Sequence, residues 1–150
     1  TLAENVAMPL QLYSGLDARG AAAVASYKLA LVGLAGFEGF LPAAISGGMA
    51  KRAAIARAMA LDPEILFLDE PSAGLSPAMQ DEVFARIAAI NHAGVSILIV
   101  EQNAHKALRI CHRGYVLDSG VDAYTGTGAE LLVDPKVIEL YLGTLAKSRK

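Results

Sequence analysis

The stretch ILFLDEP, residues 65–71, constrains the fold more than any other part of this 150-residue chain. Its four consecutive apolar residues show no polar alternation, which predicts a central strand of a parallel sheet covered on both faces. Asp69 and Glu70 follow at the carboxyl end of that strand, the edge where open α/β sheets bind ligands. Because neighbouring carboxylates repel each other, a cation or a polarised water must offset their repulsion. The stretch therefore predicts an α/β fold with a metal or a reaction at this edge.

The flanking patterns predict helices before this strand and a strand–helix–strand unit that contains it. A helix is expected over 18–34, closing at Gly33 or Gly36, and another over 49–61, with Arg52 and Arg57 on its surface. The later elements are expected to be a strand at 64–69, a helix at 78–91, a strand at 95–100, a helix at 104–110, a strand at 114–120 and a helical segment at 137–145. Parallel strands would bring Glu101, Gln102 and Asn103 to the edge that holds Asp69 and Glu70.

Composition and charge exclude several classes of protein. The apolar content is 54%, yet no stretch reaches the roughly 18 uncharged apolar residues of a membrane-spanning helix. The single Cys111 suits a reducing compartment, and His92, His105 and His112 show no metal-ligand spacing with it. A net charge of −2 with scattered basic residues gives no stripe for nucleic acid. The tail KSRK, residues 147–150, is interpreted as a solvated terminus.

The stretch ISGGM, residues 45–49, places a serine and two glycines before a predicted helix. Free backbone N–H groups at a helix start attract anions, and glycine lets a phosphate approach closely, although Ser46 alone could be an ordinary N-cap. Followed by ILFLDE and SAGLSP, it resembles the ATP-binding cassette (ABC) family in order and spacing, as signature loop, Walker B strand and D-loop. The resemblance covers nearly the whole chain. It implies a partial P-loop NTPase fold, with a helical lobe at 1–45 facing a membrane subunit, and the signature helix plus the C-terminal part of the RecA-like core at 46–150.

The resemblance also implies a role for each residue of these motifs. Asp69 would help to hold Mg²⁺ through coordinated water, and Glu70 would orient or deprotonate the water that attacks the γ-phosphate of ATP. Ser46, Gly47 and Gly48 would contact the γ-phosphate of a nucleotide held mainly by a second, identical or related, ABC ATPase subunit in a head-to-tail dimer. The alternative from the residues alone is that the two acids are solvated or paired with a lysine.

Four departures from the family pattern affect these assignments. Met49 stands in place of the signature glutamine, Ser76 replaces the D-loop acid, and Gln102 replaces the switch histidine. Glutamine can hydrogen-bond a phosphate oxygen but cannot carry an imidazolium charge. No GxxxxGK[ST] stretch occurs, so the Walker A loop that holds the phosphates is missing. We therefore expect the C-terminal portion of a cassette, inactive toward ATP by itself.

The two halves of the chain resemble different branches of the family. Segments from DEPSAGLSP onward, including VEQNAHKAL and VIELYLG, resemble the ATPases of branched-chain amino acid importers, whereas TLAENVAMPL through the signature helix resembles those of lipid-asymmetry transporters. Amino acid import is favoured, with transmembrane permease subunits as partners and a cytoplasmic, peripheral location at the inner face of the membrane. A chromosome-maintenance or break-repair ATPase is disfavoured because sustained heptads and DNA-binding charge are missing. A truncated cassette that dimerises without hydrolysis remains a further alternative.

Overall fold

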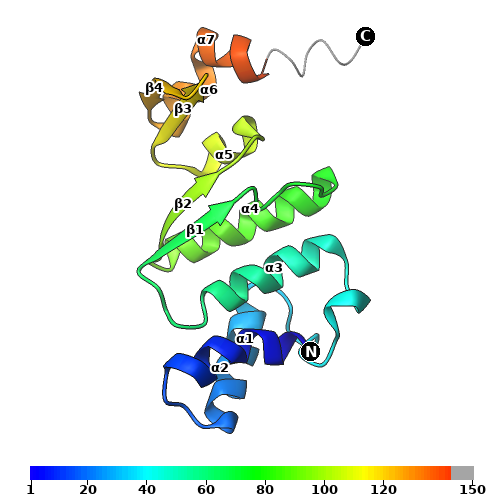
Figure 1. The fold of residues 1–150 in the computed structure, drawn as a ribbon. Helices are drawn as coiled ribbons and strands as arrows, with labels where there is room; N and C mark the ends of the chain where they lie inside the picture. Colours follow the sequence, from blue (N-terminus) through cyan, green and yellow to red (C-terminus); the bar gives the residue numbers. More distant parts are fainter. Residues whose placement is uncertain (143–150) are drawn as a thin grey trace. The chain divides into compact units, whose positions relative to one another are not determined.

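The computed structural model describes residues 1–142, and its internal contacts divide the chain into two compact units. The first unit is Thr1–Val100 and the second begins at Glu101. Each is considered by itself (Figure 1). None of the helices within residues 1–142 has the length and hydrophobicity needed to cross a membrane.

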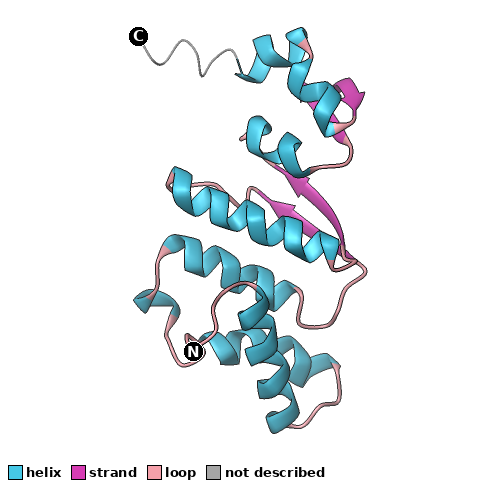
Figure 2. Cartoon of the chain, turned by 180° about the vertical axis from the view of Figure 1, so that it is seen from behind, coloured by secondary structure: helices cyan, strands magenta, loops and turns pink. Residues whose placement is uncertain are grey.

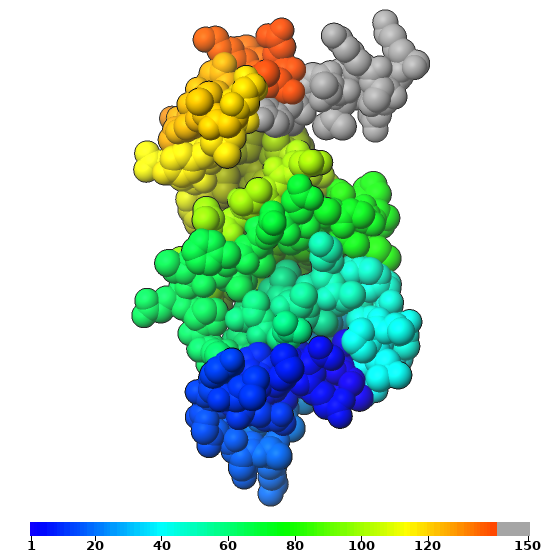
Figure 3. Space-filling view, in the orientation of Figure 1, coloured from blue at the N-terminus to red at the C-terminus, as the bar shows by residue number. Residues whose placement is uncertain are grey.

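Three α-helices and a 3₁₀ turn form the lobe at the start of the first unit: α1 (Leu2–Tyr13), α2 (Ala18–Leu31), η1 (Pro42–Ala44) and α3 (Gly47–Ala58). Asp17 caps α2 by accepting a hydrogen bond from the Gly20 N–H at 2.7 Å, and the helix ends before Gly33, whose φ is +73°. The predicted helix and its stop at Gly33 are confirmed, whereas α1 was not predicted. Space-filling atoms of these helices pack closely against one another (Figure 3), around a core of Leu2, Val6, Leu10, Ala25, Leu29, Val32 and Leu34.

A buried lysine ties α2 to the loop that follows α3. Lys28 is only 4% exposed, and its ammonium forms an ion pair with the carboxylate of Asp62, which is largely in solvent. Asp62 has a φ of +50°, a left-handed conformation that aspartate tolerates better than most residues. Because a buried ammonium requires a partner, this pair fixes how the loop returns from α3 toward the sheet.

The remainder of the first unit is a strand–helix–strand unit, as predicted. Strand β1 (Ile65–Asp69) pairs in parallel with β2 (Ser96–Val100), with Phe67 opposite Leu98, and α4 (Pro77–His92) connects them. Figure 2 shows the helix running alongside the two strands. The register places the carboxyl ends of both strands at one edge, because Asp69 pairs with Val100.

The prediction that both faces of the sheet are covered is wrong for the described residues. Leu66 is 3% exposed, but its neighbour Phe67 is 70% exposed, and the same alternation continues along β1. The described sheet to which β1 belongs has two strands, and successive side chains point to opposite faces, so burying one row leaves the other open. The open row consists of Ile65, Phe67, Leu98 and Val100.

The second unit packs short elements around a small apolar cluster. It contains α5 (Ala104–Ile110), the antiparallel strands β3 (Gly114–Asp118) and β4 (Val121–Gly126), α6 (Gly128–Val133), α7 (Pro135–Val137) and the π-helical turn η2 (Ile138–Leu142). The core residues are Leu108, Val116, Leu131 and Val137. The predicted helix at 104–110 is confirmed. The strand predicted at 114–120 is found over Gly114–Asp118, because Ser119 and Gly120 form the turn to β4, which was not predicted. Residues 143–150, with the rest of the predicted helical segment and the KSRK tail, lie outside the described residues.

Candidate functional site

The two carboxylates lie where the sequence predicts them, at the carboxyl end of β1. Asp69 is the last residue of the strand and is exposed, and Glu70 follows it half-buried. The backbone of Glu70 has a φ of +43°, which is uncommon for a residue other than glycine and costs about 1–3 kcal/mol. Its N–H donates to the Val100 carbonyl at 2.8 Å, which joins the turn to the end of β2. The chain therefore bends sharply at the residue predicted to activate water.

The surroundings of Asp69 are compatible with one protein ligand to Mg²⁺, but not with a site built wholly from protein. Within residues 1–142 no group of three or more His, Cys, Asp or Glu side chains could hold a metal ion. Mg²⁺ is commonly held by one or two carboxylates, with water and substrate phosphates completing its six oxygen ligands. The exposed carboxylate of Asp69 fits that pattern, because it leaves room for water and phosphate on its open side.

The predicted signature loop forms the start of α3. Ser46 is the N-cap, and its hydroxyl oxygen accepts a hydrogen bond from the Met49 N–H at 3.3 Å. Gly47 is exposed, whereas Gly48 is buried, where a Cβ would come within 3.3 Å of the Met79 side chain. The N–H groups of a first helical turn have no partner inside the helix, so an anion could approach at Gly47. A capped helix start of this kind is also common without any ligand.

The D-loop segment lies beside the signature turn. Ser76 is exposed and caps α4, with its hydroxyl accepting from the Met79 N–H at 3.5 Å. A Cβ at Gly47 would stand 3.6 Å from the Leu75 side chain, in ordinary contact. Two of the three motifs that carry the family resemblance thus lie next to each other within one unit.

Gln102 belongs to the second unit, just after β2. Gln102 is exposed, and its backbone carbonyl oxygen accepts a hydrogen bond from the Ala104 N–H at 2.8 Å where α5 begins. Its predicted place at the same edge as Asp69 and Glu70 stays a prediction.

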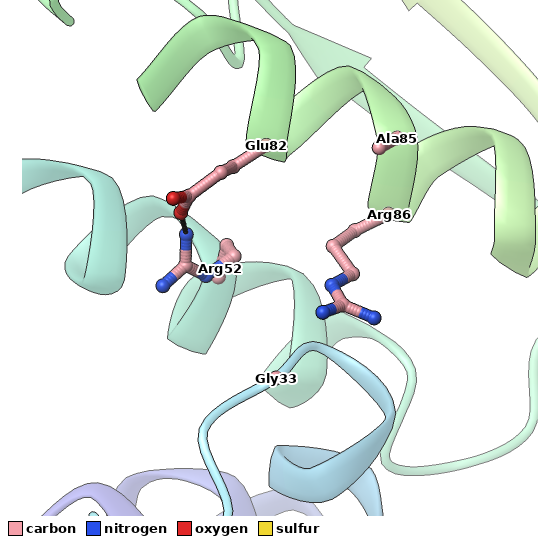
Figure 4. A pocket seen from close by; sticks show the side chains of 5 residues that line it. All are labelled: Gly33, Arg52, Glu82, Ala85 and Arg86. Carbon is pink, nitrogen blue, oxygen red and sulfur yellow. Dashed lines mark hydrogen bonds and ion pairs between the residues drawn. The ribbon is translucent and has the colours of Figure 1, made fainter. Parts of the chain in front are cut away.

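A groove of about 530 Å³ lies between α3, α4 and the loop after α2, and none of the predicted site residues lines it (Figure 4). The prediction that Arg52 lies on the surface is wrong: its side chain is 11% exposed and pairs with Glu82, and its Nε atom is buried without a hydrogen-bond partner. Arg86 lies against Gly33, where a Cβ would come within 2.9 Å of its guanidinium. Helical periodicity alone could not reveal the Arg52–Glu82 pair, because the two residues lie 30 positions apart.

Comparisons with known proteins agree with the motifs. The family model described as ABC transporter matches residues 3–73. The branched-chain amino acid transport ATP-binding protein BraG of Pseudomonas aeruginosa is 44% identical over 99 residues, covering 66% of this chain and 42% of BraG. The intermembrane phospholipid transport ATP-binding protein MlaF of Haemophilus influenzae is 32% identical over 143 residues, covering 93% of this chain and 54% of MlaF.

Solved structures give the same fold. The ATP-binding cassette MJ1267 in its ADP conformation has a TM-score of 0.79 at 24% identity, covering 95% of this chain and 63% of that structure. The cassette MJ0796 was solved as a dimer in a post-hydrolysis state bound to ADP and Pi. Its TM-score is 0.72 at 27% identity, and the match covers 85% of this chain and 56% of that structure.

The structure is thus part of a P-loop NTPase fold of the cassette type. The chain belongs to the ATP-binding domains of ABC transporters and contains part of one cassette. It spans about half or less of the length of the curated relatives described above.

Proposed function

We propose that these residues supply the signature loop and the Walker B acids of an ABC transporter ATPase, which couples ATP binding and hydrolysis to solute transport. The observation that carries the proposal is the arrangement of three motifs in one unit. Asp69 is the last residue of β1 and Glu70 follows it, the Gly47 turn begins α3, and the D-loop residue Leu75 lies beside that turn, 3.6 Å from where a Cβ at Gly47 would stand.

In this proposal each group acts through a property that the structure gives it. Mg²⁺, when bound with ATP, supplies charge neutralisation at the phosphates. Asp69 offers an exposed carboxylate to that ion, and Glu70, half-buried at the sharp bend, orients or deprotonates the attacking water. Gln102 would hydrogen-bond a phosphate oxygen without carrying a charge.

The signature groups serve the nucleotide of a second subunit in a head-to-tail dimer. Ser46 and Gly47 are not packed away: Gly47 is exposed and Ser46 is half-buried. Met49 and Ser76 would flank the same nucleotide, although their side chains differ from the family pattern. The Walker A loop would come from a segment that these 150 residues do not contain, so the chain alone should neither bind ATP tightly nor hydrolyse it.

For the transported solute we favour branched-chain amino acids, with import through transmembrane permeases that contact the lobe at 1–45, while residues 46–150 form the ATPase part. The support is the 44% identity to BraG. Phospholipid trafficking is the second candidate, because the similarity to MlaF extends over 93% of this chain. The ATPase would lie at the cytoplasmic face of the membrane. Identifying the permease and solute-binding genes beside this one would distinguish the two cargo classes, and a start codon close to Thr1 would favour a cassette that dimerises without hydrolysis.

The catalytic proposal is tested by Glu70→Gln in a cassette that contains these residues together with a Walker A loop. ATP binding should be retained, and hydrolysis should fall by about 10²–10⁴-fold, the usual contribution of a positioned base. Glu64→Gln is the matched control, because Glu64 is an exposed glutamate next to the opposite end of the same strand. Hydrolysis that is the same in Glu70→Gln as in the control would remove Glu70 from the catalytic role.

A further inference from the structure

A lysine on the signature helix reaches the backbone of the Walker B glutamate. The Nζ atom of Lys51, in the second turn of α3, donates to the carbonyl oxygen of Glu70 at 3.3 Å, although the two residues are 19 positions apart. Lys51 is half-buried as a residue, and its ammonium is directed at a backbone carbonyl of another element. Long lysine side chains at a surface normally keep the charge in solvent, and a half-buried one directed at a carbonyl needs an explanation.

The residue whose carbonyl it contacts has an unfavourable backbone conformation. Glu70 has its positive φ, its N–H donates to Val100, and its carbonyl oxygen also accepts from the Ala73 N–H at 3.1 Å. Strained backbone of this kind persists only where the surroundings fix it from several sides. Of these three hydrogen bonds, only the one from Lys51 has a charged donor, and that donor belongs to α3, an element remote in sequence from Glu70.

We infer that Lys51 is a positioning residue for Glu70: it holds the strained peptide of the water-activating acid and links that acid to the signature turn of the same subunit. The inference rests on the proposed function. Lys51 lies four residues after Gly47, about one turn along the same helix. In the proposed dimer, the amides at the start of α3 therefore contact the nucleotide of the second subunit. The Lys51 ammonium on the same helix orients Glu70, which acts on the nucleotide of its own subunit.

The kinetic test compares Lys51→Met and Lys51→Arg in the cassette that contains a Walker A loop. Methionine keeps the length and flexibility of the stem but removes the donor, whereas arginine retains a charged donor. We expect Lys51→Met to lower kcat about tenfold, equivalent to about 1.4 kcal/mol, with little change in KM for ATP. Lys51→Arg should restore most of the loss. Lys136→Met makes the same change at an exposed lysine of the second unit and should have no effect.

A second measurement does not depend on activity. Backbone hydrogen exchange at Glu70 and Ala73 should accelerate about tenfold in Lys51→Met, which corresponds to about 1.4 kcal/mol. Exchange at Leu29, in the core of α2, should stay unchanged. A role limited to general stability would instead accelerate exchange at all three positions and would not separate kcat from KM. Should Lys51→Met fail to fold, Lys51→Leu, which likewise has no hydrogen-bond donor, is used with the same expectations.

Glu70→Gln in the same assay separates this inference from the proposed function. If Glu70→Gln abolishes hydrolysis while Lys51→Met matches Lys136→Met in kcat and in exchange at Glu70, the role of Lys51 is refuted and the proposed function stands. If Glu70→Gln leaves hydrolysis intact, the proposed function fails first. A loss of kcat in Lys51→Met without faster exchange at Glu70, or without recovery in Lys51→Arg, also refutes the inference.

Discussion

Adjacent residues of β1 offer a direct test of the one-sided burial of the sheet. Leu66 and Phe67 differ by one position and are 3% and 70% exposed. Truncating a fully buried leucine to alanine costs about 2–5 kcal/mol in the free energy of unfolding, and truncating a fully buried phenylalanine about 3–5 kcal/mol. Since less than a third of the Phe67 surface is buried, we expect Phe67→Ala to cost only about 1 kcal/mol in this chain. Leu66→Ala should therefore destabilise the chain more, although it removes the smaller side chain.

Urea unfolding of the 150-residue chain at low concentration, followed by circular dichroism, measures both variants. The open row of Ile65, Phe67, Leu98 and Val100 should also make the chain self-associate, and Phe67→Ala should reduce this in sedimentation experiments. Equal costs for the two variants, or a cost of about 3 kcal/mol or more for Phe67→Ala, would mean that both faces are covered in solution. A monodisperse, cooperatively unfolding monomer of the unmodified chain would likewise contradict the expectation of self-association.

Two further predictions concern single groups. Asp62→Asn should lower the free energy of unfolding by about 1–2 kcal/mol in urea titrations, because it leaves the buried Lys28 ammonium without a charged partner. Asparagine still tolerates the positive φ at this position, so the backbone is not the cause. A loss no larger than that in Glu64→Gln would show that the ion pair is dispensable. Burial raises the pKa of the Cys111 thiol, and only the thiolate reacts with iodoacetamide. Alkylation near pH 8 should therefore be slower in the folded chain than in urea, and its rate should rise at a higher pH than for a free thiol. Equal rates in the folded and unfolded chain would refute this.

The elements that the sequence predicted are those whose residues alternate or recur with a clear period between strong stops. The helix at 104–110 shows such a period, whereas the strand at 64–69 was predicted from an unbroken apolar run between stops. Strand β4 was missed because VDAYTG has little apolar alternation. The sequence signal for β4 is the Ser119-Gly120 pair before it. In the structure both residues have positive φ, as in the tight turns that join antiparallel strands.

Within the candidate site, position along a strand was predictable but contact across elements was not. The sequence placed Asp69 and Glu70 at a strand end because that position follows from a local apolar run. Nothing local to residues 49–61 indicates that Lys51 reaches the Glu70 carbonyl, or that the next residue, Arg52, is buried against Glu82. Such contacts depend on how α3 packs on its neighbours, which a pattern of period 3.6 does not specify.

The disagreement over β1 is itself informative, because the sequence and the structure conflict on one row of side chains only. A strand with one solvated face usually carries polar residues on that face, yet β1 and β2 place Ile65, Phe67, Leu98 and Val100 there. Their composition suits a covering layer that residues 1–142 do not supply. In a complete cassette such a layer would make Phe67 as costly to truncate as a core phenylalanine, about 3–5 kcal/mol. The difference between the unfolding free-energy costs of Phe67→Ala in this chain and in the cassette therefore measures the contribution of the covering layer. An equal, small cost in both would show that the apolar row is not a buried surface of the functional protein.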